Sequence, residues 1–312
     1  MLVTRRRSKS RAAFRLCRSL ILRALIVAML VAVSQEGHAQ SPLGARPEYV
    51  TRDLTEIPNA QALRATIWLP GLNDGYVPQG IVLVGERLFV SAYKSIDRKQ
   101  DRGPCRLFAL DVRTGATLAH LDLPKACGHA GGLVKGEGQT LIVTDARVIF
   151  EIELAGAAEK SLGRVKRAVR LGGGVKGSFA ASDSGGFWIG EYARSDAGKM
   201  FRFPWSALQK QTLTEADAVE VLPSPIYAQG AAVDSHGALW VMRSGSKFGE
   251  LVKLDRRTGV AVARFAMPAG AEGISFAPDG TLWTLSEAGS QRWSEWAAFY
   301  PLAFRFDPKF LR

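Results

Sequence analysis

The sequence predicts an all-β fold, because one strand–turn–strand pattern recurs along most of the chain. An apolar strand, a turn containing Gly, and a second strand rich in Phe or Trp appear most clearly at 79–90, 229–241 and 272–284. Separate counts of each strand position give five units, with starts about 43 to 52 residues apart. Four short strands per unit at this spacing are typical of β-propeller blades. We therefore expect a five-bladed β-propeller.

The two ends of the repeat predict how the ring closes. A segment with the pattern of a fourth strand, 65–69, precedes the first complete unit, whereas the last unit has only three strands. We expect 65–69 to pair with 302–306 and complete the last sheet, which also covers an open strand edge. A six-bladed ring is the alternative, but its extra blade would need strands from 40–63, where Pro42, Pro47, Asp53 and Pro58 interrupt any strand pattern.

The N-terminal region has the features of an export signal. Residues 1–39 combine a basic start, an apolar run at 24–33 and small residues at Gly37 and Ala39. The run is shorter than the roughly 20 residues needed to span a bilayer. We expect residues 1–39 to be a cleaved signal peptide, 40–63 an N-terminal extension and 64–312 a single propeller domain. An uncleaved anchor is the alternative. The mature protein is expected to be periplasmic or secreted, with no stable membrane span.

Most of the net positive charge of the chain lies in residues 1–39. The full sequence has a net charge of +12, but removing residues 1–39 leaves 33 basic and 28 acidic side chains. No remaining segment alternates a long run of Lys and Arg with stacking aromatics, so we expect no nucleic-acid partner. The mature protein is expected to be a monomer.

Two cysteines remain after the leader. Cys105 lies just before the third strand of the first unit and Cys127 just after the fourth, so both fall at the same end of one antiparallel pair. Because exported proteins meet an oxidising environment, we predict a disulfide between them. Two free buried thiols are the alternative.

Polar residues are predicted to meet at one mouth of the central channel. In a propeller, the innermost strands start on the face where the second strands end. Strand starts contribute Gln79, His129, Gln229 and Glu272. Second-strand ends contribute Tyr93, Asp145, Glu191, Arg243 and Glu287. Each residue alone could simply supply hydrogen bonds to the channel end, but together they predict a polar ligand site.

Two chemistries could use this set. Asp145 and Glu272 offer hard oxygen ligands for Ca²⁺ or another divalent cation, whereas His129 and Glu272 could act as a general acid–base pair. Two long loops, 94–104 and 288–300, are expected to overhang the same mouth. In the second loop, Trp293 and Trp296 are expected to stack on a sugar or another planar ligand. The alternative is that they pack on the propeller itself.

The blade openings resemble those of the secreted bacterial β-propellers of the gluconolactonase, NHL and streptogramin-lyase group. The resemblance rests on Pro-Gln-Gly at 78–80, His-Ala-Gly-Gly at 129–132, Ala-Gln-Gly at 228–230 and Ala-Glu-Gly at 271–273. It implies the fold and leaves the activity open, because such propellers include lactonases, lyases, cyclases and binding modules.

The chain departs from the site residues of two enzyme types in this group and has residues of the right type for a third. Gluconolactonase-like enzymes hold a divalent metal with Glu, Asn and Asp, and no Asn stands at the matching openings. Plant-type glutaminyl cyclases are similar in opening on a Gln-Gly strand, but their second-strand Glu is replaced by Ala92 or Tyr93. Streptogramin lyases use a His and a Glu, for which His129 and Glu272 have the right chemistry.

Two functional hypotheses follow. In the first, the protein is an exported propeller that binds a small or extended polar ligand, such as a small molecule, sugar or peptide, without catalysis. The alternative is a metal-assisted or His/Glu-assisted hydrolase or lyase of the lactonase type. We rank binding first, because no catalytic template is matched in full.

Overall fold

The computed structural model describes residues 41–99, 102–156 and 161–312. Contacts divide the chain into Met1–Ser41 and Pro42–Arg312, and the predicted signal peptide lies outside the described residues. Within the described ranges, no helix has the length and apolar character needed to cross a membrane.

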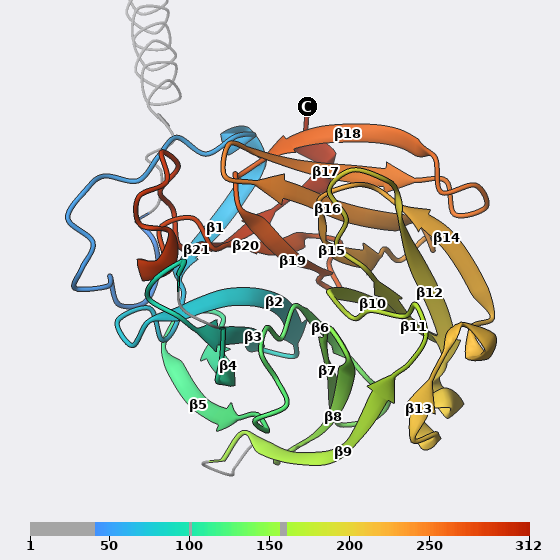
Figure 1. Ribbon diagram of the computed structural model, residues 1–312. Coiled ribbons are helices and arrows are strands. Elements are labelled where there is room, and N and C mark those ends of the chain that lie inside the picture. The colour runs from blue at the N-terminus through green and yellow to red at the C-terminus, as the bar shows by residue number, and fades with distance from the viewer. Residues whose placement is uncertain (1–40, 100–101, 157–160) are drawn as a thin grey trace, which may run out of the picture. The chain divides into compact units, whose positions relative to one another are not determined.

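Five β-sheets surround a common centre, as predicted (Figure 1). We number them as blades 1 to 5 in chain order. Blade 1 consists of β2 (Tyr76–Val84), β3 (Arg87–Lys94), β4 (Cys105–Asp111) and β5 (Thr117–Asp122). Blade 2 consists of β6 (Gly132–Lys135), β7 (Thr140–Asp145), β8 (Val148–Leu154) and β9 (Gly163–Leu171). Blade 3 consists of β10 (Phe179–Asp183), β11 (Gly186–Gly190), β12 (Gly198–Pro204) and β14 (Glu220–Ser224). Blade 4 consists of β15 (Ala228–Val233), β16 (Leu239–Gly245), β17 (Phe248–Leu254) and β18 (Ala261–Met267).

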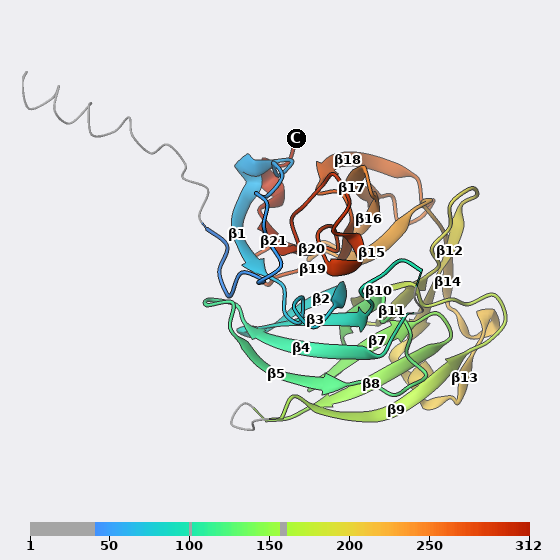
Figure 2. The same ribbon diagram turned by 60° about the vertical axis from the view of Figure 1, so that its left-hand side comes forward.

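Blade 5 closes the ring in the predicted way (Figure 2). It contains β19 (Ala271–Phe276), β20 (Leu282–Ser286), β21 (Leu302–Phe306) and β1 (Leu63–Trp68). β1 runs antiparallel to β21, with Thr66 opposite Phe304, and an ion pair of 3.3 Å between Arg64 and Asp307 lies at the end of the pairing. The ring therefore has five blades, and the segment before β1 supplies no sixth.

The N-terminal extension is part of the closure. Leu43 forms a parallel bridge with Ile67, and its N–H and C=O groups bond to Thr66 O and Trp68 N, both at 2.9 Å. This covers part of the outer edge of β1, which would otherwise expose unpaired backbone groups.

Burial along the strands explains why the sequence forms blades. The innermost strand β19 is buried at five of its six positions, because it is packed between neighbouring blades. The outer strand β18 instead alternates between exposed and half-buried side chains, the two-residue period of a strand with one wet face. Glycines let the innermost strands approach closely: a Cβ on Gly273 would lie 2.8 Å from the Cα of Gly80.

One segment of blade 3 supports blade 2. The segment between β12 and β14 contains two 3₁₀ helices, η2 (Trp205–Gln209) and η3 (Glu215–Asp217), with β13 (Thr212–Leu213) between them. β13 pairs in parallel with β9 and so covers the outer edge of blade 2. Leu213 is fully buried there, which accounts for an apolar residue in a polar insertion.

Candidate functional site

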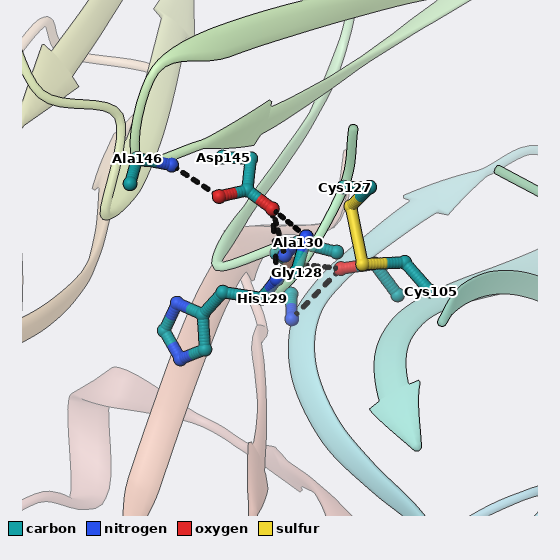
Figure 3. Close-up of a disulfide and its surroundings, with 9 residues drawn as sticks. Cys105, Cys127, Gly128, His129, Ala130, Asp145 and Ala146 are labelled. Carbon is teal, nitrogen blue, oxygen red and sulfur yellow. Dashed lines mark hydrogen bonds between the residues drawn. A yellow bond between two sulfur atoms is a disulfide. The ribbon is translucent and has the colours of Figure 1, made fainter. Parts of the chain in front are cut away.

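The predicted disulfide joins Cys105 and Cys127, whose Cα atoms are 5.8 Å apart (Figure 3). Directly after Cys127, the turn at 128–130 wraps around the carboxylate of Asp145. Asp145 Oδ2 accepts backbone N–H bonds from Gly128 at 2.6 Å, His129 at 2.7 Å and Ala130 at 3.3 Å. Three successive N–H groups thus form an anion nest for this side chain.

The turn is strained as well as anchored. Ala130 has a φ of 54°, in the left-handed region that non-glycine residues rarely occupy. Its carbonyl accepts a hydrogen bond of 2.8 Å from Ser91 Oγ in blade 1. Bonds from two blades therefore fix the backbone that presents His129, and the imidazole ring points away from the disulfide (Figure 3).

Two carboxyl groups of blade 5 form the centre of the channel mouth. Glu272, on β19, and Glu287, just after β20, are 2% and 8% exposed, and their side chains are hydrogen-bonded to each other. Gln229 Nε2 of blade 4 donates to Glu272 Oε1 at 2.8 Å. Gln79 Nε2 of blade 1 donates to Glu287 Oε2 at 3.2 Å. Three blades therefore hold this pair, which we call the carboxyl pair.

The carboxyl pair holds a proton near neutral pH. Burial raises the pKa of Glu287 to about 7, although hydrogen bonds from Trp293 and Gln79 oppose the increase. Burial and the neighbouring Glu287 raise the pKa of Glu272 well above its usual value. Because two buried carboxylates this close repel each other, one of them stays protonated.

Trp293 lies over the pair. It belongs to the short 3₁₀ helix η4 (Gln291–Trp293), and its indole Nε1 donates to Glu287 Oε2 at 2.7 Å. Its ring stacks on Trp296 with centroids 4.7 Å apart. Both indoles are half-buried, so they pack on the propeller and on each other while keeping an accessible edge.

An aromatic and cationic rim surrounds the mouth. The rings of Tyr93 and His129 lie 5.4 Å apart, and the guanidinium carbons of Arg102 and Arg292 lie 5.5 and 5.8 Å from the centre of the Tyr93 ring. Burial lowers the pKa of His129 to about 4, and Arg102 contributes to the decrease. His129 is therefore neutral at pH 7.

The two predicted loops are joined above this rim. Arg292 Nη1 donates to the Asp97 carbonyl at 2.9 Å, and Arg98 forms an ion pair of 2.7 Å with Glu295. From the N-terminal extension, the Tyr49 hydroxyl donates to Gly289 O at 2.8 Å. The loop carrying Trp293 is thus held from two sides.

The structure brings together most, though not all, of the predicted site residues. Gln79, Gln229, Glu272, Glu287, Trp293 and Trp296 form one connected group through the contacts above. Tyr93 and His129 join it through Arg292, whose guanidinium carbon also lies 5.1 Å from the centre of the Trp293 ring. Arg102 and Arg292 were missed by the sequence analysis. Both lie in the loops expected to overhang the mouth, so their place near the mouth could have been predicted from the sequence. Their contacts with Tyr93 depend on the conformation of these loops and could not.

Three predicted residues are engaged elsewhere. Glu191 forms an ion pair of 3.2 Å with Lys176 in blade 3. Arg243 donates to Ile226 O at 2.8 Å and forms a short ion pair with Glu250, its cross-strand partner. The carboxylate of Asp145 accepts hydrogen bonds from the backbone N–H groups of its nest.

The metal-ligating potential of the mouth is limited. Among the described residues, one group of three His, Cys, Asp or Glu side chains has ligand atoms close enough to share a metal ion, namely Cys105, Cys127 and Asp145. Its two sulfurs form the disulfide, so they offer no thiolate. A cation at the mouth would instead have to use the oxygens of Gln79, Glu272 and Glu287.

The opposite end of the channel is chemically plainer. A cavity of 330 Å³ lies where the innermost strands of all the blades end. Its lining is mostly apolar, as at Leu133, Val233 and Ile274, and its polar residues include Lys135, Ser182 and Asp234. The titratable pair and the aromatic rim are therefore features of the other mouth.

The sequence matches no protein-family model and no curated protein. Among solved structures, the chain is similar to a glutaminyl cyclase from Myxococcus xanthus, with a TM-score of 0.52, 14% identity, and coverage of 80% of this chain and 94% of the other. It is also similar to a quinoprotein alcohol dehydrogenase-like protein from Bacteroides thetaiotaomicron, with a TM-score of 0.40, 14% identity, and coverage of 70% and 51%. The chain thus spans about half the length of the latter protein.

These likenesses concern the fold. At 14% identity and a TM-score of 0.52, the likeness to the glutaminyl cyclase supports the fold and leaves the activity open. The disulfide is the feature of the chain that bears on its location, because such bonds persist in oxidising compartments. It is typical of an exported protein.

Proposed function

We propose that the protein is an exported β-propeller, periplasmic or secreted, that binds a small polar ligand at the channel mouth over the carboxyl pair. The observation that carries this proposal is the carboxyl pair itself. It is buried, it is held by amide groups from blades 1 and 4, and Trp293 lies over it. Buried carboxyls stabilise a fold poorly compared with apolar side chains, so their retention at a channel mouth points to ligand recognition.

Thermal denaturation of the mature protein with separate panels of free amino acids, dipeptides, monosaccharides and aldonolactones tests the proposal. A ligand at a hundred times its Kd stabilises the folded state by about 2.7 kcal/mol. We expect this increase in Tm to be lost in Glu287→Gln. It should be kept in Glu86→Gln, the same substitution in an exposed turn. Equal stabilisation of all three proteins would place the ligand elsewhere and contradict the proposal.

Acid–base catalysis is the second candidate, and one observation favours it. A pKa of about 7 for Glu287 suits a group that gives and takes protons at neutral pH. Together with neutral His129, it would serve a hydrolase, lyase or cyclase. Turnover of an aldonolactone or an N-terminal glutaminyl peptide, lost in Glu287→Gln, would support catalysis. Binding of the same compounds without turnover would favour the first proposal.

A further inference from the structure

Gln79 has an unused hydrogen-bond acceptor inside the mouth. Its side chain is 1% exposed, and Nε2 donates to Pro78 O at 2.7 Å and to Glu287 Oε2. Because both partners are acceptors, the orientation of the amide is fixed and Oε1 is the atom left over. This oxygen has no hydrogen-bond partner among the described residues. An unpaired buried acceptor destabilises the site, so the site favours a ligand that brings a donor.

The carboxyl pair beside Gln79 sets the chemistry of that donor. It accepts N–H bonds from Gln229, Gln79 and Trp293 and is held together by one shared proton. A primary ammonium group has N–H donors and no acceptor, so it can replace the shared proton and also reach Gln79 Oε1. A hydroxyl group is less suitable, because its lone pairs would face further acceptors.

The charges around the pair require a second group on the ligand. With one proton, the carboxyl pair carries a single negative charge, whereas Arg102 and Arg292 carry two positive charges and His129 is neutral. An ammonium group that replaces this proton leaves the site with one net positive charge, which an anionic group on the same ligand would balance. Arg102 is exposed at the rim, so its guanidinium is available to a carboxylate or similar anion.

A metal ion fits these donors less well. Ca²⁺ takes six to eight oxygen ligands. Here the amide nitrogens of Gln79 and Gln229 and the indole nitrogen of Trp293 all direct N–H groups at the carboxylates. These donors occupy oxygens that a metal would need.

We propose that the channel mouth binds a small zwitterion, whose primary ammonium group is held by Gln79 Oε1 and the Glu272–Glu287 pair and whose anionic group is held by Arg102. The simplest such compound is a free α-amino acid. This inference rests on the proposed function and names its ligand class. When the ammonium group binds, it takes the place of the shared proton, which leaves to solvent.

Matched ligands test this proposal in the wild-type protein. Each of the twenty free amino acids is first tested for an increase in Tm, and the best is then titrated calorimetrically in its free, N-acetylated and C-amidated forms. We expect N-acetylation to weaken binding at least a hundredfold, because it removes the charge and two donors. Amidation should weaken binding about tenfold, because it removes the partner of Arg102.

Variants connect these effects to the named atoms. We expect Gln79→Leu to weaken binding of the free amino acid about tenfold, and Arg102→Gln to weaken it without changing binding of the amide. Glu86→Gln serves as the control. At pH 7, wild-type binding should release about one proton, measured from binding heats in buffers of different ionisation enthalpy. Glu287→Gln should release less, because Glu272 is then the only titrating group of the pair.

The results separate this inference from the proposed function. If N-acetylated ligands, sugars or lactones bind as tightly as free amino acids and depend on Glu287, the zwitterion inference is wrong and the proposed function stands. The inference is also wrong if Ca²⁺ alone stabilises the protein in a Glu287-dependent way. If none of the twenty amino acids binds, the inference is overturned. If no compound in any panel depends on Glu287, the proposed function falls with it. Should Gln79→Leu not fold, the three ligand forms in the wild-type protein still decide the question.

Discussion

Substitution of Glu287 by Gln should change how the stability of the protein depends on pH. Glutamine keeps an oxygen that accepts from Trp293 and Gln79 but removes the titrating group. In the wild-type protein the pKa of Glu287 rises from its usual 4.5 to about 7. Between these values the folded state binds more protons than the unfolded state, so the free energy of unfolding falls as the pH rises. One pKa unit corresponds to 1.36 kcal/mol, so the full loss is about 3 kcal/mol.

Urea denaturation followed by tryptophan fluorescence measures this loss directly. We expect the stability of Glu287→Gln relative to the wild type to improve by about 3 kcal/mol from pH 4.5 to pH 7.5, the interval set by the two pKa values. The variant also removes the repulsion that raises the pKa of Glu272, which acts in the same direction. Glu86→Gln controls for the substitution itself. A difference between wild type and Glu287→Gln that stays constant with pH would refute the idea of a buried, protonated pair.

Substitutions at three places test the scaffold around the mouth, each by urea denaturation. Replacing Cys105 and Cys127 with Ala removes a bridge across 22 residues and should cost about 3 kcal/mol; an unchanged stability would show that the bridge does not form. Asp145→Ala should cost about 3 kcal/mol or more and Asp145→Asn less, because Ala leaves buried N–H groups without an acceptor; equal losses would argue against the nest. Ile67→Ala, at a fully buried position of β1, should cost about 2 to 5 kcal/mol, and a loss no larger than that of the half-exposed Leu118→Ala would mean that β1 does not close the ring.

The fold could be predicted from the sequence because its signals are local and repeated. Each blade has its own alternating strands and glycine turns, so five weak patterns support one another. The pairing of β1 with β21 followed from one missing strand, and the disulfide from two positions at the same strand ends. The two-residue strand β13 could not be predicted, because it is too short for any periodicity and pairs with a different blade.

The site was only partly predictable. The strand ends show which residues lie at the channel mouth, but they do not show what the side chains of these residues contact. Asp145 was expected to face a ligand, yet the turn at 128–130 folds back on it. The ion pair of Arg243 with Glu250 could have been found, since the two residues lie opposite each other in adjacent strands. The contacts of Arg102 and Arg292 depend on loop conformations that no short pattern specifies.

The closure of the ring also sets the order in which this protein can fold. Arg64 and Asp307 are 243 positions apart in the sequence, so the first strand is synthesised early and receives its partner last. Contacts over such distances form slowly. Until β21 arrives, β1 has a bare edge and blade 5 is incomplete beside blade 1. A premature stop before β21 would therefore leave an open ring and not a smaller closed one.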